Sequence, residues 1–281
     1  MPNGSHKRGA EVNESRVTLA EPDLYFAMLE RSALHHWWSV GVERIERRWV
    51  QNEFKSGVRG TVAKRKWLDV GCGTGRRLAQ WSQWVFWEMQ VGIDPSPISM
   101  NHEMGSIARL QGKLPGLPLM EPCFDLVTAF DVIQHVSKPI REQALSEISR
   151  VVKPGGILLI RTNSGGFWGK PQGDDSIAER NWLDQALNQF HFRIVRSSHF
   201  NMTGGFIEDF MKRYCKWQSG NCEASTTFKT GLPQQWQARP DGHWLGRWFG
   251  SIESRIAGTG LVKIPFGHSY LVMARKEVDH D

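Results

Sequence analysis

The sequence is poor in the features that mark disulfide-bonded, zinc-binding and membrane-spanning proteins. It has only 4 cysteines in 281 residues, and no two of them form a Cys-x-x-Cys pair, so neither a disulfide framework nor a metal site is expected. No apolar run approaches the roughly 20 residues that cross a bilayer. Residues 1–14 are polar and lack the apolar core of a signal peptide, which predicts a cytoplasmic location.

The composition is that of an ordinary globular chain, with 40% hydrophobic and 23% charged residues. The length predicts one large domain, or one domain with a small appendage. The net charge of +6 fits either a solvated basic surface or an anionic partner, such as a phosphate-bearing metabolite, a lipid surface or nucleic acid. Thirteen tryptophans are unusual, and they predict a tryptophan-rich core or an apolar, sugar-stacking wall.

The most informative stretch runs from Lys66 to Gly75. Its first five residues predict a buried strand, and Gly71-Cys72-Gly73-Thr74-Gly75 predicts a tight turn before a helix. Glycine lets a ligand approach the backbone closely, and the start of a helix offers unpaired N–H groups. Asp69, at the end of the strand, is placed to take a cationic or hydroxyl group. We therefore predict a small-molecule cofactor crevice in an open α/β sheet.

A second acid supports this crevice. The next predicted strand, residues 90–93, ends at Asp94, about 20 residues beyond the glycines. A carboxylate in that place is positioned to bind the two hydroxyls of a ribose. The alternatives are a dinucleotide-binding unit and a glycine turn without function.

Three motifs resemble those of the class I S-adenosylmethionine-dependent methyltransferases. Leu68-Asp69-Val70-Gly71-Cys72-Gly73-Thr74-Gly75 matches the first motif of that family throughout. Arg150-Val151-Val152-Lys153-Pro154-Gly155-Gly156 is another strong match. Asp131-Val132-Ile133-Gln134-His135-Val136 stands where the family typically has Asp-Val-Leu-Glu-His-Val. The resemblance covers residues 66–161 strongly and the flanks more weakly.

This resemblance implies a Rossmann-like α/β fold. We expect a seven-stranded, mostly parallel sheet with an antiparallel last strand, helices on both faces and a helical insertion before the last strand. The expected parts are a disordered tail (1–20), an N-terminal helical cap (21–60), the Rossmann-like core (61–200), an insertion that caps the substrate (201–263), and the final strand and tail (264–281). Helices are expected at 21–51, 76–88, 98–108, 139–152 and 181–189, with a linker at 52–61 and a turn at 153–156.

The resemblance also implies a cofactor, S-adenosylmethionine, and roles for the residues that bind it. Asp69 engages the methionine ammonium, and Asp94 with Pro95 takes the ribose. Gly71 and Gly73 let the backbone lie against the cofactor, Cys72 fills the loop, and the backbone of Phe130 contacts the methionine portion. The family usually has an acid for the adenine amino group after the third strand, but Lys113 and Leu114 stand there. We expect these two to supply backbone groups and apolar contact instead.

Catalysis and acceptor binding are less directly indicated. His135 is the candidate general base for a hydroxyl acceptor; the alternative is a structural histidine, and His36, His199 and His268 are weaker candidates. His35-His36-Trp37-Trp38 resembles a segment of bacterial sugar- and polysaccharide-associated methyltransferases. Trp37, Trp38 and Asn163 are therefore candidate substrate residues.

Three functional hypotheses follow. The first is methyl transfer to an O or N atom of a small molecule, anionic or sugar-bearing. The second is an RNA or DNA methyltransferase, which the positive charge favours; against it, no Asn/Asp-Pro-Pro-Tyr/Phe motif follows the fourth strand and no RNA-binding module is evident. The third is a non-catalytic protein that retains the cofactor site. Two departures from the family pattern are compatible with it: Gln134 replaces the usual Glu, and no acid stands where the family binds the adenine amino group. The oligomeric state is left open.

Overall fold

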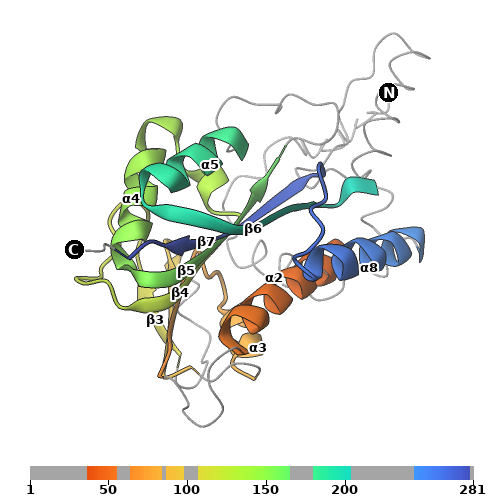
Figure 1. The fold of residues 1–281 in the computed structure, drawn as a ribbon. Helices are drawn as coiled ribbons and strands as arrows, with labels where there is room; N and C mark the ends of the chain where they lie inside the picture. The colour runs from red at the N-terminus through yellow and green to blue at the C-terminus, as the bar shows by residue number, and fades with distance from the viewer. Residues whose placement is uncertain are drawn as a thin grey trace, which may run out of the picture.

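Seven strands form one sheet in the computed structural model, which describes residues 37–55, 64–83, 87–97, 107–164, 180–203 and 244–278. In space the strands follow the order β3-β2-β1-β4-β5-β7-β6 (Figure 1). Strand β7 runs antiparallel to both of its neighbours, and the other strand pairs are parallel. The predicted seven-stranded sheet with an antiparallel last strand is therefore confirmed. The strands are β1 (Lys66–Val70), β2 (Met89–Asp94), β3 (Ala108–Gln111), β4 (Phe124–Phe130), β5 (Val152–Asn163), β6 (Phe192–Phe200) and β7 (Ser269–Lys276).

Helices cover both faces of the sheet (Figure 1). On one face lie α2 (Trp37–Lys55), α3 (Arg76–Trp81) and α8 (Trp244–Gly258), and on the other lie α4 (Arg141–Val151) and α5 (Arg180–Gln189). Two short 3-10 turns, Ile133–His135 and Lys138–Ile140, connect β4 to α4. Because both faces are covered, the central strands consist of nearly continuous apolar runs.

Helix α2 is fixed by contacts with α8 and with the sheet. The indole N–H of Trp49 donates to the carbonyl of Ala257 at 2.9 Å. Arg44 donates to the hydroxyls of Ser251 and Ser254 at 3.3 and 3.0 Å. Val42 and Ile45 are fully buried, so the apolar side of α2 packs into the core.

Helices α2 and α3 differ in length from the prediction. Helix α2 continues to Lys55, through the first part of the expected linker. Helix α3 ends at Trp81 instead of residue 88. There the hydroxyl of Ser82 donates to the carbonyl of Leu78 at 2.7 Å, and the side-chain amide of Gln90 donates to the same carbonyl at 3.1 Å. Side-chain hydrogen bonds of this kind compete with continued helical pairing.

The expected turn at residues 153–156 is wrong, because these residues belong to β5. Phe124 pairs with Val152 whereas Leu126 pairs with Ile157, so the register shifts between the two pairs. The extra residues form a bulge, in which Gly155 takes a positive φ of 77°.

Several expectations fall outside the described residues: the tail 1–20, the first part of the helical cap, the helix at 98–106 and residues 204–243 of the insertion. Of the insertion, α8 is described, and it precedes β7 in the chain as expected. Among the described helices, none has the length and hydropathy required to cross a membrane.

Replacing Gly41 with alanine tests the packing of α2 on β6. A Cβ at Gly41 would lie 2.5 Å from Cζ of Phe200, and its other close contacts are atoms of the same ring. We expect Gly41→Ala to lower the free energy of unfolding by about 1–3 kcal/mol, although alanine favours a helix by about 1 kcal/mol. In a Phe200→Leu background the loss should disappear. Urea denaturation of the four proteins gives the result, and an equal loss in both backgrounds would contradict it.

Candidate functional site

The glycine loop folds over the end of β2. The backbone N–H groups of Gly71 and Cys72 both donate to the carbonyl of Ile93, at 2.7 and 3.1 Å. Gly71 has a φ of +72°, and a Cβ added there would lie 2.3 Å from a methyl of Val132. Only glycine fits this position without strain, because the backbone is left-handed and the neighbouring side chain is in contact.

Asp94 is held at the end of β2 by two backbone amides. Its side chain is buried, and its two oxygens accept hydrogen bonds from the N–H groups of Gly73 and Ser96, both at 2.9 Å. A carboxylate oxygen has more than one lone pair, so each retains capacity to accept from a ligand hydroxyl. Asp94 is therefore an oriented acceptor beside the glycine loop.

Asp69 is a buried carboxylate with a perturbed pKa. Its Oδ1 accepts a hydrogen bond from the hydroxyl of Thr128 at 2.5 Å. Burial raises the pKa of Asp69 to about 6, while the Thr128 hydrogen bond and then the charge of Arg77 act in the lowering direction. An ionised carboxylate in such a place favours a cationic partner. Above about pH 6, where its carboxylate is mostly ionised, Asp69 is therefore suited to bind a cationic group.

A network of buried ion pairs lies next to Asp69. Glu46 of α2, fully buried, accepts from Arg77 of α3 and from Nη1 of Arg161 at 2.6 Å. Arg161, in β5, also pairs with Asp131 just after β4, its Nε lying 3.1 Å from each carboxylate oxygen. Burial alone would lower the pKa of Arg161, but attraction to Asp131 and Glu46 raises it, so the guanidinium stays charged.

The arginines of this network also contact aromatic rings. The guanidinium of Arg77 lies 4.1 Å from the ring centre of Phe130. Arg161 lies 5.3 Å from the same ring and 5.2 Å from that of Trp38. Phe130 therefore lies near both guanidinium groups at the carboxyl edge of the sheet, and Trp38 lies near that of Arg161.

The structure brings most of the predicted cofactor residues to one edge of the sheet. Asp69 lies near the end of β1, the glycine loop follows β1, Asp94 ends β2, and Phe130 ends β4. Cys72 fills the space between the loop and the sheet: burial raises the pKa of its thiol, and its Sγ lies 2.7 Å from where a Cβ of Gly92 would be.

The predicted adenine loop begins beside Asp94. The N–H of Gly112 donates to the carbonyl of Asp94 at 3.1 Å. Lys113 and Pro95 are exposed, and Leu114 is half-buried against the core.

The predicted catalytic and substrate residues are more scattered. His135 is exposed in the turn after β4. Asn163, the last residue of β5, donates its backbone N–H to the side chain of Gln134 at 2.8 Å. The indole of Trp38 donates to Ser269 at 3.2 Å, and Trp37 packs against Gly250 of α8.

Among the weaker histidine candidates, His199 is buried with Nδ1 3.1 Å from the carbonyl of Ile264, and His268 is half-buried. His36 lies outside the described residues.

The sequence prediction missed Thr128, Glu46, Arg77, Arg161 and Asp131 as site residues. Arg161 and Asp131 carried one available signal: each is a charged residue that comes directly after an apolar strand run. Glu46 had no such signal, because its partners come from other elements.

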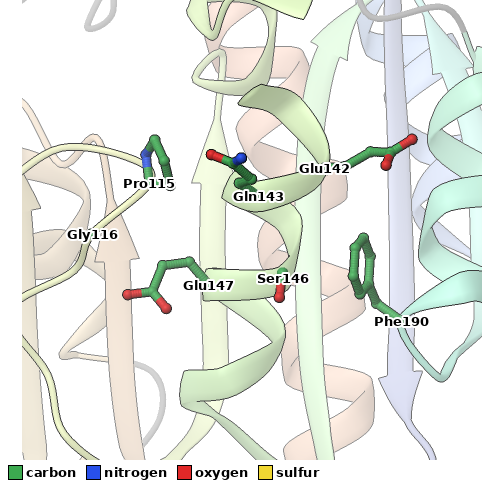
Figure 2. A pocket seen from close by; sticks show the side chains of 7 residues that line it. All are labelled: Pro115, Gly116, Glu142, Gln143, Ser146, Glu147 and Phe190. Carbon is green, nitrogen blue, oxygen red and sulfur yellow. The ribbon is translucent and has the colours of Figure 1, made fainter. Parts of the chain in front are cut away.

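A separate hollow of about 480 Å³ lies on the flank of α4 (Figure 2). Pro115 and Gly116 form one side of it and Phe190 another, with Glu142 and Glu147 among the α4 residues between them. None of its lining residues belongs to the glycine loop or to a strand end. The candidate site is thus defined by the ends of the strands and not by this hollow.

A parallel α/β sheet with a glycine loop after β1 and acids at the ends of β1 and β2 defines a class of nucleotide-cofactor-binding proteins. Comparison with known proteins specifies the class. The family model described as "Methyltransferase domain" matches residues 68–160, from β1 to near the end of β5. Residues 68–160 of this chain are therefore a methyltransferase domain of the class I type, whose cofactor is S-adenosylmethionine.

Two relatives and one solved structure illustrate the similarity. A probable S-adenosylmethionine-dependent methyltransferase of Mycolicibacterium smegmatis is 29% identical over 157 residues, which cover 52% of this chain and 54% of the relative. The ubiquinone/menaquinone biosynthesis C-methyltransferase UbiE of Yersinia enterocolitica is 32% identical over 132 residues, 43% of this chain and 50% of the relative. The match thus spans about half the length of these curated relatives. The crystal structure of the cyclase SpnF has a TM-score of 0.50 at 19% identity, covering 83% of this chain and 81% of the other, and so shows the fold.

Replacing Asp69 with asparagine should stabilise the folded protein at neutral and higher pH. The unfolded chain ionises Asp69 near its ordinary pKa of 3.8, whereas the folded protein does so near 6. The folded protein therefore binds more protons in this window, and Asp69 lowers stability as the pH rises through it. The expected gain of Asp69→Asn is about 2–3 kcal/mol above pH 6 and vanishes below about pH 4. Urea unfolding of both proteins above pH 6 and below about pH 4 measures this gain. A gain in stability that is the same at both pH values would refute this account.

Proposed function

We propose that this chain transfers the methyl group of S-adenosylmethionine to a small-molecule acceptor. The observation that carries the proposal is the pair of buried carboxylates, Asp69 and Asp94, that flanks the glycine loop at the carboxyl edge of the sheet. These two groups differ in environment, and each environment matches a different part of the cofactor.

The donor set fits this cofactor. Asp94 is oriented by the amides of Gly73 and Ser96, and its remaining lone pairs suit the vicinal hydroxyls of a ribose. Asp69 is buried, so a cationic partner would stabilise its ionised form. The ammonium of the methionine portion is such a partner. Gly71 and Gly73, both with positive φ, allow the ligand to approach the backbone.

The remaining cofactor roles belong to the same edge. Phe130 offers backbone and ring at the end of β4, which pairs with β1. Lys113 and Leu114 follow Gly112, whose N–H donates to the carbonyl of Asp94. These residues bind and orient the cofactor, whose sulfonium supplies an already activated methyl group when bound. Orientation of the two reactants then provides much of the acceleration.

His135 is the proposed general base for an acceptor that must lose a proton. It stands in the turn that leaves β4 at the cofactor edge, and its exposure leaves the ring accessible to a substrate. A neutral imidazole has a suitable proton affinity near pH 7. We propose that the acceptor binds near Trp37, Trp38 and Asn163. Trp38 lies near Arg161, Trp37 precedes it in the chain, and Asn163 ends β5.

The acceptor is proposed to be an anionic or sugar-bearing small molecule methylated on oxygen or nitrogen. The net charge of +6 and the aromatic residues at the site support that class. The name of one relative specifies a quinone-pathway C-methyltransferase, so the domain type does not by itself select the attacking atom. RNA is the second candidate, favoured only by the positive charge.

Cofactor binding is tested with Asp94→Ala. Loss of an oriented, charged acceptor should weaken binding of S-adenosylmethionine about tenfold to a hundredfold, measured by titration calorimetry. Asp125→Ala is the control, because Asp125 is a half-buried acid near the start of β4 and pairs with Lys153 at the opposite end of the strands. Unchanged affinity in Asp94→Ala, or equal weakening in both variants, would refute the assignment.

The acceptor class is tested with methyl-labelled S-adenosylmethionine and fractionated extract. We expect label in the small-molecule fraction, dependent on the protein and reduced with Asp94→Ala when S-adenosylmethionine is not saturating. Label in RNA that nuclease releases would favour the second candidate. No transfer to any fraction by protein that binds the cofactor would favour the non-catalytic alternative.

A further inference from the structure

We propose that Glu46 is a positioning residue: it holds Arg77 and Arg161 in ion pairs of their own and so keeps the carboxylate of Asp69 available to a cationic ligand group. The proposal rests on the proposed function only for the identity of that cation. The arrangement of the charges is a property of the ligand-free protein.

Glu46 divides its two oxygens between two arginines. Oε2 accepts from Arg77, which comes from the helix after the glycine loop, and Oε1 accepts from Arg161, near the end of β5. Glu46 itself is fully buried on α2. A buried carboxylate is tolerated only when its oxygens are satisfied, so the two arginines and Glu46 fix one another.

Both arginines also lie within electrostatic reach of Asp69. Their charges lower its pKa, whereas that of Glu46 raises it. Without the charge of Glu46, Arg77 loses its ion pair at 14% exposure, and Asp69 is a buried acid within its electrostatic reach. An arginine that paired with Asp69 would occupy the place of the ligand's cation.

The charge balance leads to the same conclusion. Asp69 and the ion-pair network beside it hold three acids, Glu46, Asp69 and Asp131, and two arginines, Arg77 and Arg161. With Asp69 ionised, one negative charge is left for a ligand to neutralise. With Glu46 neutralised, acids and arginines are equal in number, and a cationic ligand finds no surplus charge.

A second glutamate of the same helix provides a matched control. Glu53 also bridges two arginines, with Oε1 2.6 Å from Arg196 and Oε2 2.7 Å from Arg275. Its partners lie on β6 and β7, and its charge is not among the main influences on the pKa of Asp69. Glu46→Gln and Glu53→Gln thus each remove two arginine ion pairs from α2, but only Glu46 is among the charges that act on Asp69.

The test measures the titration of Asp69 by carboxyl carbon NMR in the ligand-free protein. We expect a midpoint near 6 in the wild type and in Glu53→Gln. In Glu46→Gln the midpoint should fall by about one pH unit or more, since a negative charge is lost and the arginines turn toward Asp69. Arg77→Gln should raise the midpoint, because the charge of Arg77 lowers the pKa of Asp69. This variant still tests the proposal if Glu46→Gln does not fold.

Calorimetric titration with S-adenosylmethionine at about pH 8 gives the second readout. We expect binding at least tenfold weaker in Glu46→Gln and unchanged in Glu53→Gln. Weaker binding with an unmoved Asp69 midpoint would show a purely structural role and overturn the proposal. If the wild type does not bind S-adenosylmethionine, the proposed function fails, and the NMR midpoints still decide the role of Glu46.

Discussion

Charge buried at the carboxyl edge of the sheet is the constraint on which the rest of this structure depends. Burying a charged carboxylate or guanidinium costs free energy unless it is paired with an opposite charge. Removing one partner leaves the other charge buried and unpaired. Glu46, Arg161 and Asp131 satisfy one another through three elements. Asp131 even adopts a positive φ of 58° and donates its backbone N–H to the carbonyl of Arg161 at 2.9 Å. The helix α2 can therefore dock in one position only with respect to β4 and β5.

The aromatic core and the polar site are continuous with each other. Trp67 is fully buried and stacks on Trp81 with ring centres 5.2 Å apart. Its indole N–H donates to Thr128 at 2.9 Å, and Thr128 in turn donates to Asp69. Trp67 of the core thus orients the hydroxyl of Thr128, which in turn orients the carboxylate of Asp69. Several of the many tryptophans serve packing, as the sequence indicated, and this one also supports the site.

Local patterns in the sequence were sufficient for the strands, the glycine loop and the two acids of the crevice. Each of these features lies within one short stretch, where apolar runs end in glycine or aspartate. The network around Glu46 was not predictable in this way, because Glu46 and Arg161 are separated by 115 positions and meet only after the sheet has formed. The early end of α3 and the bulge of β5 were missed for a related reason. Both depend on partners contributed by a neighbouring strand, such as Gln90 and Phe124.

The position of β7 between β5 and β6 has a consequence for synthesis on the ribosome. Strand β6 pairs with β7 alone, and β7 emerges only after residues 201–268 have been made. Until then β5 has an open edge and β6 has no place in the sheet, a state in which unpaired strands invite contacts with other chains. The first five strands can assemble early, whereas closure of the sheet awaits the final hairpin-like pairing. Nascent chains paused between β6 and β7 would be the ones most in need of a chaperone.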